Sequence, residues 1–240
     1  MQALMTPEFW IAVGQIIMID ILLGGDNAVV IALACRKLPP AQRTRGILWG
    51  TAGAIVLRVI LIFFALQLLS IPFLKVIGAI LLLWIGVKLL LPEDEDGHTH
   101  IEGSDRLWGA VKTVIVADLV MSVDNVIAIA GAAETAGGDH TMPLVIFGLL
   151  VSIPIIVWGS QLVIKLMDRY PAIITFGAML LGWIAGTMAV SDPALISPEV
   201  LPQLPKLPLT DAVKYVAGVA GALLVLAIGK ALQTRRQGAD

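Results

Sequence analysis

The chain has 240 residues, of which 58% are hydrophobic and only 14% are charged. A soluble domain carries roughly 25% charged residues because its surface must be hydrated, so this composition excludes a soluble globular protein. The 16 basic and 18 acidic residues give a net charge of −2, and the absence of a long basic run in the sequence argues against nucleic-acid binding. The single cysteine, Cys35, permits no intrachain disulfide. The sequence therefore belongs in a lipid bilayer.

Seven apolar windows lie between Pro-containing, Gly-rich or charged segments, and each approaches or exceeds the roughly 20 residues that cross a bilayer. In chain order they are Phe9–Cys35, Gly46–Leu69, Phe73–Leu91, Leu107–Ala133, Met142–Met167, Ala172–Val190 and Ala212–Leu232. The first lacks a basic leader and is too long for a signal-peptide core, so we expect a retained span. We predict an all-α, polytopic membrane protein with seven transmembrane helices and a single membrane domain, residues 1–240.

Most of the charged residues lie in or beside the connecting segments. An acidic loop is expected at residues 92–106, and a Pro-rich, extended loop at residues 191–210. Twelve of the 16 Lys and Arg residues lie in or beside the first, third and fifth loops and the C-terminus. Because cytoplasmic loops hold the excess of basic residues, we expect the N-terminus outside and the C-terminus in the cytoplasm. The acidic loop is then cytoplasmic and the Pro-rich loop extracytoplasmic.

The sequence contains an internal repeat. The segment beginning at Ile19 aligns with the segment beginning at Ala117 at an offset of 98 residues, and Pro72 aligns with Pro171 at an offset of 99. Residues 9–91 and 107–190 are thus two copies of a three-helix unit, and the seventh helix, residues 211–232, stands outside them. Because three is odd, the copies enter the membrane from opposite sides. Inverted repeats of this kind are typical of secondary transporters, although they also occur in other membrane proteins.

The repeat places carboxylates and amides inside the first and fourth spans, where polar groups usually mark an ion pathway. These candidate metal ligands are Asp20, Asp26 and Asn27, and Asp118, Asp124 and Asn125. Oxygen donors suit hard divalent cations. Carboxylates that face one another repel when both are ionised, so without a cation at least one should bind a proton, which makes metal–proton exchange natural. The alternative is that these residues only pair helices through hydrogen bonds.

Further residues are secondary candidates. Gly24 and Gly25 can open the first helix, and Ser122 is the counterpart of Gly24. Arg58 lies within the second span, where its counterpart Ile156 is apolar, and we expect it to neutralise an aspartate, with anion binding as the alternative. Met18 and Met121 could add a soft donor, although packing is the usual role of Met. His98 and His100 could collect metal at the cytoplasmic mouth, or simply belong to a solvated acidic loop.

The motifs GGDNAVVIALACRKLP and SVDNVIAIAGA, together with the seven-span repeat, resemble the TerC family of integral membrane proteins, a branch of the LysE-type exporter superfamily. The resemblance covers nearly the whole chain. It implies divalent metal transport, chiefly manganese efflux from the cytoplasm, with links to tellurite resistance. By position, the implied metal ligands are the same six residues.

These observations predict a manganese exporter of the cell inner (plasma) membrane that works by alternating access, with protons as the counter-ion. The expected partners are the transported Mn²⁺ or another divalent cation and the lipid bilayer; we expect no nucleic acid and no prosthetic group. The rivals are a LysE-like exporter of amino acids or small organic solutes, and a non-transporting subunit of a metal or tellurite resistance system. An enzyme is not expected, because no HExxH, GxSxG or P-loop motif is present.

Overall fold

The computed structural model describes residues 11, 14, 17–18, 26–64, 71–91, 103–137, 141–197, 200, 202 and 206–237. The elements are a helix at Asp26–Cys35 and the helices α2 (Pro40–Phe63), α4 (Leu74–Leu90), α5 (Gly103–Gly137), α6 (Thr141–Arg169), α7 (Ala172–Val190), α8 (Pro193–Ile196) and α9 (Asp211–Gln237). Within these ranges there is no strand. The chain is an all-helical membrane protein, as predicted.

Four helices in the described part are clear membrane-span candidates by length and hydropathy: Pro40–Phe63, Leu149–Arg169, Ala172–Val190 and Asp211–Arg235. The 17-residue α4 would rise about 25 Å at 1.5 Å per residue, close to the hydrocarbon thickness. The predicted span at Ala172–Val190 coincides with α7. Only part of the first predicted span falls within the described residues, as the helix Asp26–Cys35.

Several helices extend beyond the apolar windows. Helix α2 begins at Pro40 rather than Gly46, because proline is favoured in the first turn of a helix and ends of spans tolerate charge. Helix α5 begins at Gly103, inside the predicted loop 92–106, and α9 continues to Gln237. The Pro-rich segment 191–210 was predicted to be extended, yet it contains the short helix α8, where Pro193 follows the N-cap Asp192. Hydropathy windows miss such polar helical ends.

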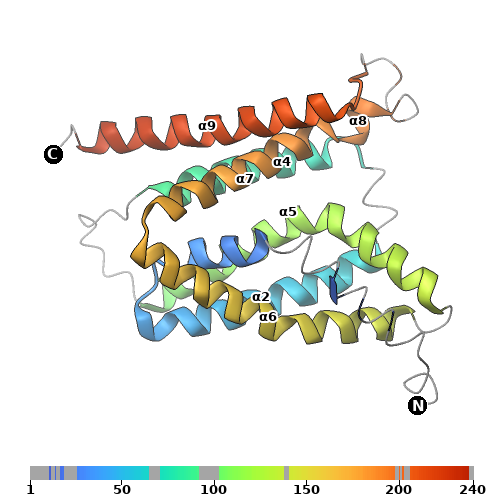
Figure 1. Cartoon of the computed structure of the whole chain (residues 1–240), viewed down its shortest axis with the longest axis horizontal. Helices are drawn as coiled ribbons and strands as arrows, with labels where there is room; N and C mark the ends of the chain where they lie inside the picture. Colours follow the sequence, from blue (N-terminus) through green and yellow to red (C-terminus); the bar gives the residue numbers. More distant parts are fainter. Residues whose placement is uncertain are drawn as a thin grey trace.

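The helices form two layers (Figure 1). Helices α4, α7 and α9 pack on one another in the upper layer of this view, and α2, α5 and α6 pack in the lower layer. Contacts of α4 with α5 and of α6 with α7 join the layers. The helix Asp26–Cys35 is enclosed, since Ala32, Leu33 and Cys35 are fully buried. The first candidate span segment therefore lies in the core rather than against lipid.

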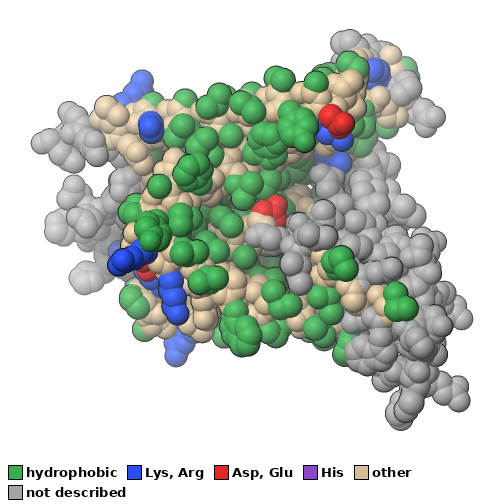
Figure 2. All heavy atoms as spheres, viewed as in Figure 1, with side chains coloured by type: hydrophobic (Ala, Val, Ile, Leu, Met, Phe, Trp, Pro, Cys, Tyr) green, Lys and Arg blue, Asp and Glu red, His purple; other side chains and the backbone are tan. Residues whose placement is uncertain are grey.

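Basic side chains lie at both ends of the bundle, and apolar side chains are spread over the surface between the two ends (Figure 2). Most of the Lys and Arg residues belong to the end where α2 begins and α6 and α9 end, which we call the basic end. Three long-range contacts define this basic end. Lys37 Nζ donates to the carbonyl of Leu91 at 2.7 Å, Arg43 Nη1 pairs with Asp168 at 2.7 Å, and Gln233 Nε2 donates to the carbonyl of Leu90 at 2.8 Å. The start of α2 and the ends of α4, α6 and α9 thus meet at one end, as a chain crossing back and forth requires.

Candidate cation site

Arg58 of α2 and Asp118 of α5 form a buried ion pair. Arg58 Nη2 lies 2.5 Å from Asp118 Oδ1, and the two residues are only 2% and 6% exposed. Ser122, one helical turn beyond Asp118, accepts a hydrogen bond from Arg58 Nε at 3.1 Å and donates to Asp118 Oδ2 at 3.0 Å. The three side chains form a closed ring that engages both oxygens of the carboxylate. Arg58 thus lies against an aspartate as its counter-charge.

The ring forms because α2 and α5 pack closely over their length. A methyl group added at Gly50 or Gly53 of α2 would collide with Val114 or Ile115 of α5. The absence of side chains at these glycines lets the two backbones approach, as small residues do between membrane helices. One and two turns further along, Arg58 therefore faces Asp118 and Ser122 at hydrogen-bonding distance.

Next to this ring lies a second group of polar atoms that lack partners. Asp26 interacts electrostatically with both Arg58 and Asp118. Its Oδ1 atom is buried and makes no hydrogen bond, and neither does Oδ1 or Nδ2 of the following residue, Asn27, which is 3% exposed. Buried polar atoms almost always have a partner, and each exception needs an explanation. Carboxylate and amide oxygens that lack a donor are ready to bind a cation.

The structure thus brings together four of the sequence-predicted residues: Asp26, Arg58, Asp118 and Ser122. Asn27 follows directly, and Asn125 is half-buried on α5. Among the described residues, no group of three or more Asp, Glu, His or Cys side chains could hold a metal ion. Asp20, Gly24, Gly25, His98 and His100 lie outside the described residues, as does the side chain of Asp124. Metal binding therefore stays a prediction.

The two methionines differ in their surroundings. Met121 is 5% exposed and packs in the main hydrophobic core with Val120 and Met188. Met18 is 59% exposed. Met121 thus has the packing role that the sequence offered as the alternative to a soft metal donor, whereas Met18 is not packed in the described part of the chain.

Two polar residues near the core were not predicted from the sequence. Thr51 of α2 is 2% exposed and its Oγ1 has no hydrogen-bond partner. It precedes Arg58 by seven residues, two helical turns, so the spacing places both on one helix face. Asp192 is fully buried and accepts four backbone N–H bonds, from Phe73, Lys75, Val76 and Ala194. An Asp directly before a proline is a typical N-cap pattern, but this pattern does not indicate a contact with the distant α4.

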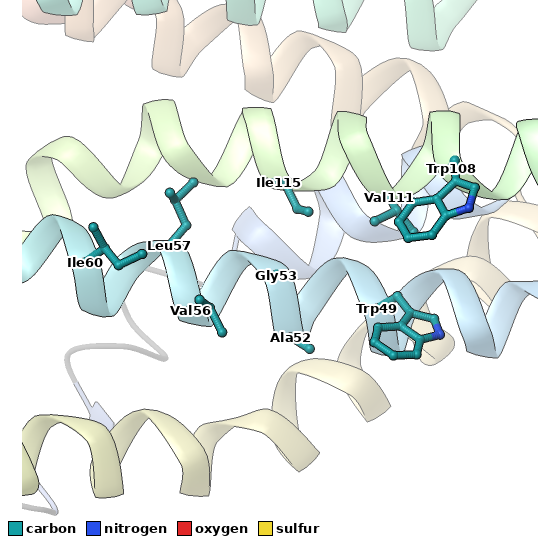
Figure 3. Close-up of a pocket in the computed structure, with 9 residues that line it drawn as sticks. All are labelled: Trp49, Ala52, Gly53, Val56, Leu57, Ile60, Trp108, Val111 and Ile115. Carbon is teal, nitrogen blue, oxygen red and sulfur yellow. The ribbon is translucent and has the colours of Figure 1, made fainter.

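An apolar cavity of about 410 Å³ lies between α2 and α5 on a different face of α2 (Figure 3). Trp49 and Trp108 stand at one end of it, and Gly53 and Ile115 lie along it. No ionisable side chain lines this cavity. It therefore offers no carboxylate or side-chain amide ligand to a metal ion, and the polar ring of Arg58 remains the site of interest.

Comparison with known proteins agrees with the membrane architecture. The sequence model of the integral membrane protein TerC family matches residues 5–237. The chain belongs to the TerC family. This TerC protein is 44% identical over 191 residues to the uncharacterized membrane protein YjbE of Bacillus subtilis, covering 80% of this chain and 84% of YjbE.

Two more distant relatives extend the comparison. The uncharacterized membrane protein YceF of Bacillus subtilis is 28% identical over 198 residues, covering 79% of this chain and 75% of YceF. The inner membrane protein YgdQ of Escherichia coli is 23% identical over 190 residues, covering 70% and 75%. No solved structure matches the chain. This TerC protein is therefore an integral, multi-pass membrane protein with inner-membrane relatives.

Proposed function

We propose that this TerC protein exports divalent cations, chiefly Mn²⁺, from the cytoplasm by alternating access, with protons moving inward in exchange. The observation that carries the proposal is the set of unpartnered oxygens of Asp26 and Asn27 beside the buried Arg58–Asp118 pair. A charged group inside a membrane protein is costly and normally serves a pathway. Hard oxygen donors favour Mn²⁺, Mg²⁺ or Ca²⁺ over Cu⁺ or Zn²⁺.

Helix contacts support the seven-span inverted repeat as the scaffold. Gly78 and Gly177 occupy equivalent positions in the two copies. A methyl group at Gly78 of α4 would meet Val120 of α5, and one at Gly177 of α7 would meet Val29 and Leu33 of the helix Asp26–Cys35. The third helix of each copy thus packs against the first helix of the other copy. Such packing between the two copies favours a site that both repeats share.

We place the basic end in the cytoplasm, with the C-terminus there and the N-terminus outside. Arg43, Lys37 and Lys88 at that end fit the excess of positive charge on the cytoplasmic side. Cations would then enter from this end and leave at the opposite end, where α4 begins and α7 ends.

A solute exporter of the LysE type is less well supported. An amino-acid substrate would need a cationic anchor for its carboxylate, and the guanidinium of Arg58 is already bound to Asp118. A non-transporting subunit of a resistance complex makes a different prediction, because the purified chain alone would then move no cation.

The test is a flux assay in liposomes that contain the purified chain, with a Mn²⁺-sensitive dye and, separately, a pH-sensitive dye inside. We expect Mn²⁺ movement with opposite proton movement, lost in Asp26→Asn and Asp118→Asn. Asp105→Asn is the matched control, because it removes an exposed carboxylate from the same helix as Asp118. Wild-type flux of lysine but not of Mn²⁺ would favour the solute exporter, and no flux of either would favour the subunit.

A further inference from the structure

The two oxygens of Asp118 are both occupied in this structure. Oδ1 is bound by Arg58 and Oδ2 by Ser122. A metal ion that used Asp118 as a ligand would lie within a few ångström of the guanidinium on Oδ1, and the two cations would repel one another strongly in this buried site. A cation that binds Asp118 therefore competes with the guanidinium.

Asp26 and Asn27 differ from Asp118 in their hydrogen bonding. The Oδ1 atom of each is buried and has no hydrogen-bond partner, while the Asp26 carboxylate also accepts backbone hydrogen bonds from Asp26 and Asn27. Asp26 interacts electrostatically with both Arg58 and Asp118. A displaced guanidinium would thus remain near a second carboxylate rather than becoming an isolated buried charge, which would cost several kcal/mol. The site thus contains one cation fixed to the chain, the guanidinium of Arg58, and two carboxylates that could pair with it, Asp26 and Asp118.

Only one half of the molecule has this cation. In the second repeat the position of Arg58 is Ile156, which is buried and apolar. A purely structural ion pair needed by each three-helix unit would recur in both copies. The single Arg instead belongs to the one site that the two copies form together.

The geometry points to Arg58 as a tethered competitor for the transported cation: its guanidinium holds Asp118 in the empty protein, yields it when a divalent cation binds, and reclaims it as the cation leaves. This inference rests on the proposed function and names a regulator of the same site. Transport requires binding weak enough for release. A built-in competitor lowers the affinity of Asp118 for its cargo and so speeds release.

The test compares Mn²⁺ binding and flux for purified wild type, Arg58→Gln and Arg58→Lys. Competition between two cations for one carboxylate predicts that Arg58→Gln binds Mn²⁺ about tenfold tighter but moves it more slowly, and that Mn²⁺ raises its thermal stability more than that of wild type. Arg58→Lys keeps a competing charge and should stay closer to wild type. Arg45→Gln is the matched control, since Arg45 is an exposed cation on the same helix.

The outcomes separate the two proposals. Wild-type flux with unchanged or weaker binding in Arg58→Gln would overturn the competitor role and leave the exporter standing. Absence of Mn²⁺ binding and flux in wild type would overturn the exporter itself. Should Arg58→Gln not fold, infrared difference spectra of ¹⁵N-arginine-labelled wild type provide a second measurement. Mn²⁺ should shift a guanidinium band that is missing in Arg58→Lys, and an unchanged band would contradict the inference.

Discussion

The carboxylate of Asp192, beyond the end of α7, accepts a hydrogen bond from the backbone N–H of Phe73 at 2.9 Å. Phe73 has a φ of 64°, a left-handed conformation that bulky residues rarely adopt. The other carboxylate oxygen accepts from Lys75 N at 3.0 Å and from Val76 N at 3.3 Å. One side chain therefore caps the start of α4 from a segment more than a hundred residues away.

Removing this cap should weaken the packing of α4 against α7. Asp192 is fully buried, so Asp192→Ala would leave several backbone N–H groups without an acceptor, at about 1–3 kcal/mol for each group left unsatisfied. We expect a clear fall in thermal unfolding temperature in detergent. Asp211→Asn, at an exposed carboxylate at the start of α9, is the control. Equal stability of the Asp192 and Asp211 variants would contradict the capping role.

A second prediction concerns the contact between α7 and α9. A methyl group at Gly186 would collide with the backbone of Ala217 and Gly218, and one at Gly221 with the backbone of Gly182. Because neither backbone can yield without separating the helices, Gly186→Ala should lower stability by about 1–3 kcal/mol, as overpacking usually does. Gly109→Ala on α5 meets nothing within 4 Å and should gain about 1 kcal/mol from helix propensity. The unfolding temperatures of the two variants should shift in opposite directions.

A third prediction separates the ion pair from its parts. Asp118→Asn removes the carboxylate that pairs directly with the buried Arg58 and should destabilise the protein by about 3 kcal/mol, whereas Arg58→Met with Asp118→Leu should recover much of that loss. Denaturation of Arg58→Met, of Asp118→Leu and of the double variant gives the coupling energy. Additive effects of the two substitutions would show that the 2.5 Å contact contributes little.

The fourth prediction sets stability against function at Asn27. Its buried amide has no hydrogen-bond partner, so Asn27→Leu should stabilise the cation-free protein by about 1–2 kcal/mol, the cost of burying an unpaired polar group. The same change removes an oxygen donor and should abolish Mn²⁺ flux in liposomes. A variant that is destabilised in the absence of metal would show that Asn27 has a structural role.

Much of the helical framework follows from the sequence because lipid-spanning segments must be apolar and continuous. The span at Ala172–Val190 was predictable on that basis. An ion pair of Arg58 with an aspartate was expected for another reason, because a cation within a span is costly without a counter-charge. The partner of Arg58 was not predictable, because helix periodicity does not specify which of several aspartates a neighbouring helix will present. Asp192 was missed for a similar reason, since its role depends on a distant backbone. The polar ends of α2, α5 and α9 lie beyond what a hydropathy window detects.

The backbone contact of α7 with α9 has a consequence for motion. Helix α9 lies outside the two repeats, yet it packs on both α7 and α4, while Asp192 fastens the start of α4 to the segment after α7. We therefore expect these three helices to move together. For the alternating cycle proposed above, this asymmetry between the two sequence repeats predicts that the two states have unequal energies even before any ion binds.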